Sequence, residues 1–179
     1  MYLLRSFVLV AAGFLIAACD PVPPPASTGP DVIQAYRINS FVARRIPVQH
    51  LEAVNAARLA QGLVPLEWSE ELQAAAQSHA VNIREQKRAW HFGSDGSSPI
   101  ERAARAGFQG QLLGENVSET FENDMVTLDA WLRDPNSRSI ILDPNARFIA
   151  LAWDQEQNAK IWWVQLIGTA SSTTQVAAF

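Results

Sequence analysis

The sequences RFIALAW at residues 147–153 and KIWWVQLIG at residues 160–168 decide the fold. Both are rich in β-branched and aromatic residues, which favour strands. The polar sequence DQEQNA at residues 154–159 separates them and has the composition of a hairpin loop. The pattern predicts two antiparallel strands near the C-terminal end of the folded part.

Helical patterns dominate the sequence before this hairpin. Ser69 is a predicted N-cap, and SPIE at residues 98–101 is a capping box with proline at the first helical position. Gly62 and Gly107 are predicted helix stops, because glycine readily adopts the left-handed conformation that ends helices. The predicted helices cover about 48–62, 69–87, 98–107, 125–135 and 137–142.

Two shorter segments, 65–68 and 112–117, are predicted to be extended. Residues 31–47 combine a weak helical pattern with a proline, and we expect an extension packed on the domain. Helices first and a hairpin last predict an α+β domain, in which helices cover a small sheet.

Composition narrows the possible functions. The chain has 179 residues, of which 48% are hydrophobic and 18% charged, which fits one domain and excludes a protein with several membrane spans. Acidic residues outnumber basic ones by 18 to 14, so we expect no nucleic-acid partner. The single cysteine excludes an intramolecular disulfide and the cysteine-based zinc motifs.

The N-terminal residues predict export. Arg5 precedes an apolar run at residues 7–18, which is too short for a membrane-spanning helix and is typical of a signal peptide. The sequence IAAC at residues 16–19 resembles a bacterial lipobox, in which the thiol of Cys19 is acylated and Cys19 becomes the new N-terminus. The alternative is an ordinary secretory signal cut near Ala18, with Cys19 incidental.

These observations divide the chain into four parts. A lipoprotein signal peptide covers residues 1–18, and the lipidated cysteine, a proline-rich linker and the extension cover 19–47. The folded domain covers 48–170, and 171–179 form a polar tail. We expect a membrane-anchored protein of the cell envelope, facing the periplasm or the cell exterior.

The sequence contains three histidines, of which His91 is the candidate site residue. His79 lies on the apolar face of a predicted helix, where a core histidine with one satisfied ring nitrogen is favoured over a ligand. His50, at the start of a predicted helix, is expected to be solvated. His91 lies in the loop sequence WHFGSDG at 90–96, and such loops commonly carry functional residues. Glu115 is a further candidate, because the preceding Gly114 allows close approach of the backbone to a cleft.

A set of short motifs resembles the bacterial branch of the CAP superfamily, which contains the cysteine-rich secretory proteins, antigen 5 and the pathogenesis-related proteins. The resemblance covers about residues 48–169, and its strength is the order of the motifs along the chain. They are NAAR at 55–58, GLVPLEW at 62–68, QSHA at 77–80, His91 with DGSSP at 95–99, GEN at 114–116, Trp131 with Pro135 and IL at 141–142, and WVQ at 163–165.

This resemblance implies a three-layer αβα sandwich with a small, largely antiparallel central sheet. It also implies a cleft lined by two histidines and two acidic residues, in which His91 and Glu115 are the first of each kind. Asn116 and Trp131 belong to the same motifs and are expected at the cleft.

The sequence departs from the family pattern where the second cleft histidine is expected. Ser137 occupies that position, and Asp134 falls roughly where the second acidic residue would be. A zinc site usually keeps three protein ligands. Because the histidine pair is broken, we predict no bound metal and no cofactor.

Two functions follow from these expectations. The favoured one is a binding or interaction module, whose cleft holds an apolar or amphipathic ligand such as a lipid, or whose surface meets an envelope protein. The six tryptophans could provide such a surface, or could simply form the core. The alternative is a cleft hydrolase that uses His91 and Glu115, with Ser137 as nucleophile or with a degenerate metal site. The glycines of a nucleophile elbow are absent around Ser137. A serine at this position is also explained by an ordinary role as helix N-cap. An enzyme is therefore the less favoured hypothesis.

Overall fold

The computed structural model of the chain describes residues 36–171. The predicted signal peptide, Cys19, the proline-rich linker, the first residues of the extension and nearly all of the predicted tail lie outside these residues. Among residues 36–171, no helix is both long enough and apolar enough to cross a membrane.

Five helices and four strands make up the described part of the chain. In order they are α1 (Ser40–Leu59), β1 (Glu67–Trp68), α2 (Glu70–Gln86), α3 (Pro99–Arg105), β2 (Gln111–Thr120), α4 (Asp124–Arg133), α5 (Pro135–Ile141), β3 (Phe148–Gln155) and β4 (Ile161–Thr169). The predicted hairpin is confirmed as β3 and β4, and the α+β class is confirmed with it.

The sheet has the strand order β1-β3-β4-β2. Strand β4 pairs antiparallel with both of its neighbours, whereas β1 pairs parallel with β3, so the sheet is mixed. The long strand β2 is at an edge of the sheet. Its register with β4 places Glu115 opposite Leu166 and Asn116 opposite Gln165.

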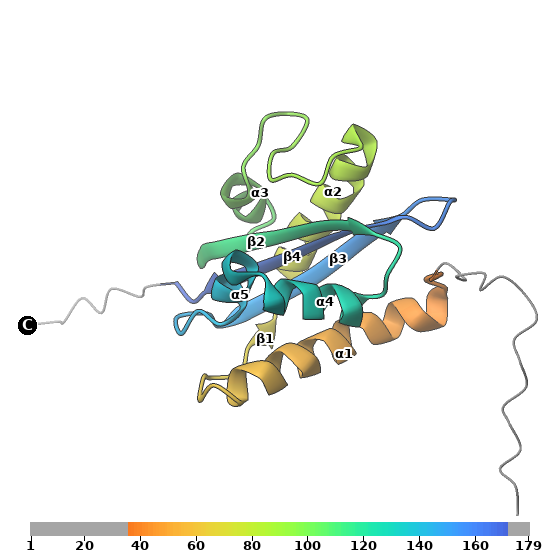
Figure 1. Cartoon of the computed structure of the whole chain (residues 1–179). Coiled ribbons are helices and arrows are strands. Elements are labelled where there is room, and N and C mark those ends of the chain that lie inside the picture. Colours follow the sequence, from red (N-terminus) through yellow and green to blue (C-terminus); the bar gives the residue numbers. More distant parts are fainter. Residues whose placement is uncertain (1–35, 172–179) are drawn as a thin grey trace, which may run out of the picture. The chain divides into compact units, whose positions relative to one another are not determined.

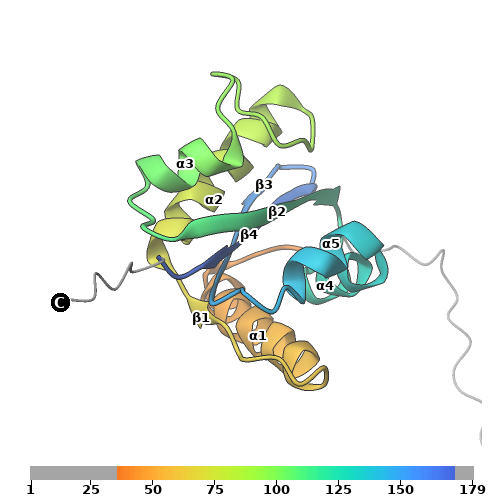
Figure 2. The same ribbon diagram turned by 90° about the vertical axis from the view of Figure 1, so that its left-hand side faces the viewer.

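Helices cover both faces of the sheet, which gives the expected three layers. Helices α2 and α3 lie on one face, and α1, α4 and α5 lie on the other (Figures 1 and 2). Because side chains alternate along a strand, Glu115 and Asn116 point to opposite faces. Glu115 shares the α2 and α3 face with Leu166, and Asn116 shares the other face with Gln165.

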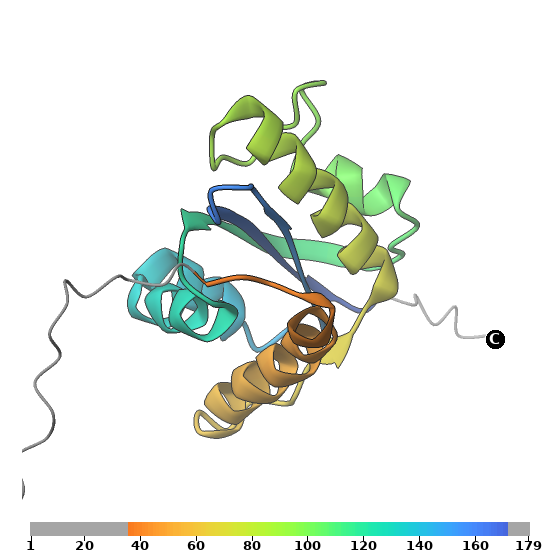
Figure 3. The same cartoon turned by 90° about the vertical axis from the view of Figure 1, so that its right-hand side faces the viewer.

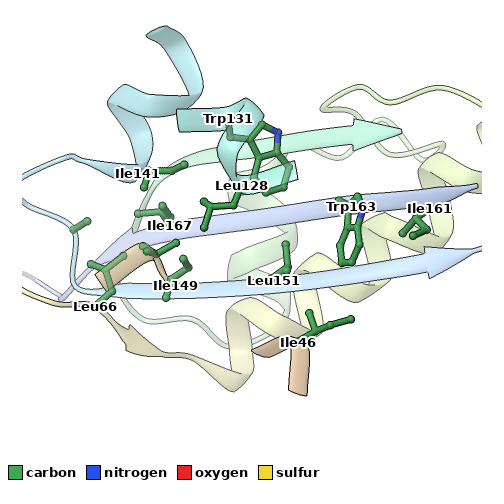
Figure 4. Close-up of a cluster of buried hydrophobic side chains, with 12 residues drawn as sticks. Ile46, Leu66, Leu128, Trp131, Ile141, Ile149, Leu151, Ile161, Trp163 and Ile167 are labelled. Carbon is green, nitrogen blue, oxygen red and sulfur yellow. The ribbon is translucent and has the colours of Figure 1, made fainter. Parts of the chain in front are cut away.

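Each face has its own apolar core. On the α1 face, Trp163 and Ile167 of β4 pack with Ile149 and Leu151 of β3 and with residues of the covering helices, Trp131 among them (Figure 4). On the α2 face, alanines at 75, 76, 80, 150 and 152 let α2 pack closely around Trp162. The buried tryptophans are therefore core residues.

Helix α1 begins earlier than the sequence predicts. It starts at Ser40, after the N-cap Asn39, whose side chain accepts hydrogen bonds from the backbone N–H groups of Phe41 and Val42. Pro47 lies inside the helix, although proline removes a helical hydrogen bond. Burial of Ile46 and Val54 against the sheet offsets this cost, and the expected start near residue 48 is wrong.

The other predicted helix ends are close to those observed. Ser69 and Ser98 cap α2 and α3, and the capping box of Ser98 with Glu101 is present in full. Gly62 and Gly107 both have positive φ, of 71° and 91°, just after α1 and α3.

Candidate ligand-binding site

His91 and Glu115 form the centre of a polar cluster on the α2 and α3 face of the sheet. His91 lies in the loop between α2 and α3, and Glu115 projects from β2. The imidazole donates from Nδ1 to Glu115 Oε1 over 2.9 Å. The side chain of Glu115 is 1% exposed and that of His91 is 54% exposed, so the carboxylate holds one edge of the ring and leaves the rest accessible.

Arg102 of α3 holds the other carboxylate oxygen. Its Nη2 donates to Glu115 Oε2 over 2.7 Å, and its Nη1 donates to the backbone carbonyls of His91 and Ser97. One buried guanidinium therefore fixes both the carboxylate and the loop that carries the histidine. The sequence does not single out Arg102, because α3 is only seven residues long and Arg105 is an equally plausible inward-facing arginine.

His79 of α2 lies on a third side of the carboxylate. Its Nε2 donates to the carbonyl of Trp90 over 2.8 Å and is 3.7 Å from Glu115 Oε1. Burial lowers the pKa of His79, which keeps the ring neutral. The prediction of a core histidine with one satisfied nitrogen is confirmed, since Nδ1 is buried without a partner among the described residues.

The contact with Glu115 sets both the pKa of His91 and the ring nitrogen that it presents to a ligand. The hydrogen bond to Glu115 raises the pKa of His91 above its usual value, against partial desolvation. With Nδ1 engaged, Nε2 is the ring nitrogen that remains to contact a ligand.

The loop before α3 is held in one conformation by short hydrogen bonds. Gly93 donates to the carbonyl of Ser97, and the N–H of Ser97 donates to the side chain of Asp95. Gly96 has a φ of 79°, which favours glycine. A Cβ at Gly93 would meet Asp95 Oδ1 at 2.5 Å, so a side chain there would displace the acceptor of the Ser97 N–H.

A groove of about 320 Å³ opens beside the imidazole, between the start of α3 and the edge strand β2. Its lining is mostly apolar, and Ile100 at its rim is 65% exposed. The lining residues are His91, Ser98, Pro99, Ile100, Leu112, Leu113, Gly114 and Glu115. A mostly apolar groove with a few polar groups in its lining is typical of a ligand site.

Gly114 allows a close approach, but it is the approach of helix α5 to β2, not the approach of the backbone to a cleft that the sequence predicts. A Cβ at this position would lie 2.7 Å from Cδ1 of Ile140 in α5, so the absence of a side chain is what lets α5 pack against β2. The glycine therefore positions a helix at the strand that carries Glu115.

A larger cavity, of about 490 Å³, lies between α2, the 93–97 loop and α3. Arg102 lines this cavity but not the smaller groove, and Asp95 and Arg105, which also line the cavity, form an ion pair with each other at 2.7 Å. Neither His91 nor Glu115 contributes to it. The smaller groove is therefore the better candidate.

Asn116 belongs to a different polar cluster, on the opposite face of the sheet. Its side chain donates to Gln165 Oε1 over 2.9 Å, and Gln165 Nε2 donates to His50 Nε2 over 2.8 Å. His50 is fully buried, which lowers its pKa to about 3, and the expectation that it is solvated is wrong. This chain of bonds links β2, β4 and α1 inside the core.

Among the described residues, no hydrogen bond or ion pair joins His91 to the remaining predicted cleft residues. Asp134 is the N-cap of α5 and accepts from the N–H of Ser137 over 2.8 Å, so the cap lies three residues before the serine that is expected to provide it. The carbonyl of Ser137 accepts from Asn116 over 3.4 Å. Trp131 is 6% exposed and packs edge-on against His50 in the core.

A family model of the cysteine-rich secretory protein family, CAP, matches residues 51–167. The chain belongs to the CAP family. Among curated proteins it is similar to the uncharacterized protein YkwD of Bacillus subtilis, at 27% identity over 118 residues, which is 66% of this chain and 45% of YkwD. The uncharacterized membrane protein YlbC of the same organism is 22% identical over 60% of this chain and 31% of YlbC. The chain spans less than half of each relative's length in these matches.

Solved structures agree with this CAP fold. An outer surface protein of Borrelia burgdorferi has a TM-score of 0.66 at 17% identity, over 76% of this chain and 99% of its own. An extracellular protein with an SCP domain from Bacillus anthracis also has a TM-score of 0.66, at 16% identity, over 75% of this chain and 45% of its own. These similarities show the fold.

The polar cluster around His91 and Glu115 does not fit a metal ion. A guanidinium already occupies one oxygen of Glu115, and a second cation there would be repelled. Asp134 is used as a helix cap, and residue 137 is a serine. Within residues 36–171, no group of three His, Cys, Asp or Glu side chains is arranged to hold a metal. We therefore derive no metal-dependent chemistry.

Proposed function

We propose that this CAP protein is a lipid-anchored binding module of the cell envelope, whose groove between α3 and β2 holds an apolar or amphipathic ligand. The observation that carries the proposal is the half-exposed imidazole of His91, which the buried Glu115 and Arg102 pair fixes beside an apolar groove. A ligand can place its apolar part against Ile100, Pro99 and Leu112 and its polar group against His91 Nε2.

The size of the groove limits the ligand. About 320 Å³ is at the lower end of the range for small-molecule sites, so the groove accommodates a small compound or part of a longer chain. An acyl chain or an apolar side chain of an envelope protein fits this description.

Two features support the envelope location. The lipobox at residues 16–19 predicts acylation of Cys19, and the similar structures include an outer surface protein and an extracellular protein. Acyl chains on one cysteine hold a protein at a membrane surface.

The hydrolase alternative lacks a nucleophile at the imidazole. No hydrogen bond within residues 36–171 joins Ser137 to His91, and the backbone of Ser137 bonds to Asn116, whose side chain lies on the other face of the sheet. Ser98 lines the groove, but its hydroxyl is engaged with Glu101 in the capping box. The geometry supports binding better than acyl transfer.

Native mass spectrometry of the protein purified from its own envelope tests the proposal. We expect a non-covalent adduct on the wild-type domain that is lost in Ile100→Asp, because a charged side chain at the rim opposes apolar binding. The control is Val64→Asp, a comparably exposed residue in the loop after α1. Equal adducts on both variants, or no adduct on any of the three proteins, would contradict the proposal.

A further inference from the structure

We propose that the outer face of the first half of α1 docks onto an anionic lipid surface. The docking face consists of Phe41, Arg44, Arg45 and Val48. The proposal rests on the lipid anchor proposed above, which keeps the domain close to a membrane.

The spacing of these four residues places them on one side of the helix. Positions i, i+3, i+4 and i+7 share a helical face. The opposite side of α1 is buried against the sheet, through Ile46, His50, Val54 and Arg58. Phe41 is 59% exposed and Val48 is 58% exposed, which is unusual for large apolar side chains on a helix that already buries its other face.

The basic residues of this region lack acidic partners within the described part of the chain. Among residues 36–171, no carboxylate forms an ion pair with Arg37, Arg44 or Arg45. Arg45 instead lies over the ring of Phe41, with its guanidinium carbon 5.6 Å from the centroid. The chain as a whole is acidic, so the two arginines of the docking face, Arg44 and Arg45, unpaired among residues 36–171 and lying beside exposed apolar groups, match an anionic lipid surface.

The docking face lies where the chain enters the folded body. Gln155 at the end of β3 fixes this entry, because its amide bonds the carbonyl of Tyr36 and the N–H of Ile38. Cys19 precedes Tyr36 by seventeen residues. At the polyproline II rise of ~3.1 Å per residue, a segment of that length would span about 50 Å, which keeps the docking face within reach of the lipid.

A second exposed apolar pair lies at the same end of the domain. Phe121 precedes α4 and Met125 lies in its first turn, and they are 47% and 40% exposed. Figures 1 and 3 show the start of α1, the β2 to α4 connection and the β3 to β4 hairpin together at this end. Gln49 of α1 donates to Asp124 of α4 over 2.8 Å, which ties the two helices together there.

Tethering by the lipid anchor allows a docking face of low intrinsic affinity to bind the membrane. An anchored domain meets the lipid at a high effective concentration, so a few interfacial contacts are enough to orient it. Docking by this face fixes which side of the domain is presented to the lipid.

The test uses the full chain, processed in its host and reconstituted into vesicles. In the Ser40→Cys variant, an acylated Cys19 leaves the introduced thiol at position 40 as the only free one, and an environment-sensitive fluorophore there reports contact with lipid. We expect a blue-shifted emission on phosphatidylglycerol vesicles and little shift on phosphatidylcholine. The control label is Ala104→Cys, exposed on α3 at the other face of the sheet, which should stay in water on both.

Removing two charges provides the second arm. Arg44→Gln with Arg45→Gln should lower the ratio of docked to undocked domain by about 30-fold, the effect of two surface arginines at an anionic membrane. The charge-matched control, Arg133→Gln with Arg138→Gln, should leave the ratio unchanged.

The outcomes separate the two proposals. A chain that does not float with the vesicles and carries an unmodified Cys19 overturns both the anchor and the docking. A chain that floats while the label at position 40 stays in water overturns the docking alone. A shift seen in native envelopes but not in protein-free vesicles assigns the face to a protein partner and also overturns it.

Discussion

Arg102 and Glu115 form a buried ion pair, with Nη2 2.7 Å from Oε2 and the two side chains 6% and 1% exposed. The pair joins α3 to the edge strand β2, and the same guanidinium holds the carbonyl of His91. The position of His91 and the charge balance around Glu115 therefore depend on one contact between α3 and β2.

Breaking this pair should destabilise the domain strongly. In Arg102→Leu, the carboxylate of Glu115 stays buried without its cation, which costs about 3–5 kcal/mol. Urea unfolding measures the loss. The control Arg105→Leu removes an exposed pair with Asp95 and should change stability little. Equal effects of the two substitutions would show that burial of the Arg102 pair has no energetic consequence.

Acid should destabilise the fold through His50. Burial lowers its pKa to about 3, so the native ring stays neutral while the unfolded chain takes up a proton below about pH 6.5. Stability therefore falls with decreasing pH, by about 1.4 kcal/mol per pH unit below 6.5 at most. His50→Gln keeps an acceptor for Gln165 and removes this dependence. If the free energy of unfolding of the two proteins changes in parallel between pH 6.5 and 5.5, His50 is not the group that causes the loss of stability.

Gly114 and Ile140 should be energetically coupled. A methyl group in Gly114→Ala meets Ile140 at 2.7 Å, and overpacking of this kind costs about 1–3 kcal/mol. Ile140→Ala should relieve most of the added cost, so a double-mutant cycle gives a coupling energy of at least about 0.5 kcal/mol. Strictly additive effects would mean that α5 does not rest on this glycine.

Gly62→Val should cost about 1–2 kcal/mol through backbone strain alone. Gly62 has a φ of 71°, and no atom lies within 4 Å of a Cβ placed there. Asparagine tolerates this conformation, so Gly62→Asn should lose less. Thermal melting compares the variants, and an identical melting temperature for valine and glycine contradicts the left-handed conformation.

Cys19→Ser should abolish lipidation and processing at this site. The intact mass of wild-type protein is expected to correspond to a chain that begins at acylated Cys19. A mature protein with a free thiol at Cys19, or one cleaved elsewhere, would disprove the lipobox interpretation.

The sequence predicts the local elements of this fold better than their partners. The β3 and β4 strands, the Ser69 and Ser98 caps and the glycine stops follow from local conformational preferences, and all are present. The parallel pairing of β1 with β3 is a long-range contact of a two-residue strand, which no local pattern encodes. The predicted start of α1 is wrong because Pro47 is a local helix breaker, whereas the helix is stabilised by burial on the sheet.

The site shows the same division. Loop position and an adjacent glycine single out His91 and Glu115, and the structure brings them into contact. The inward orientation of Arg102 and the burial of His50 depend on which face of each helix meets the sheet, and tertiary packing decides that. Alternation along β2 also separates Asn116 from Glu115, although the two are adjacent in the sequence.

Long-range ¹H–¹⁵N NMR of the three histidines during titration with a polar lipid extract of the native membrane tests the central claim most directly. The account predicts that the Nε2 signal of His91 shifts while its Nδ1 signal remains that of a nitrogen bonded to Glu115. The ring of His50, buried on the opposite face of the sheet, serves as the internal control and should not change. Lipid binding that leaves the His91 signals unmoved, or a titration that moves none of the protein's signals, would contradict a ligand groove at His91.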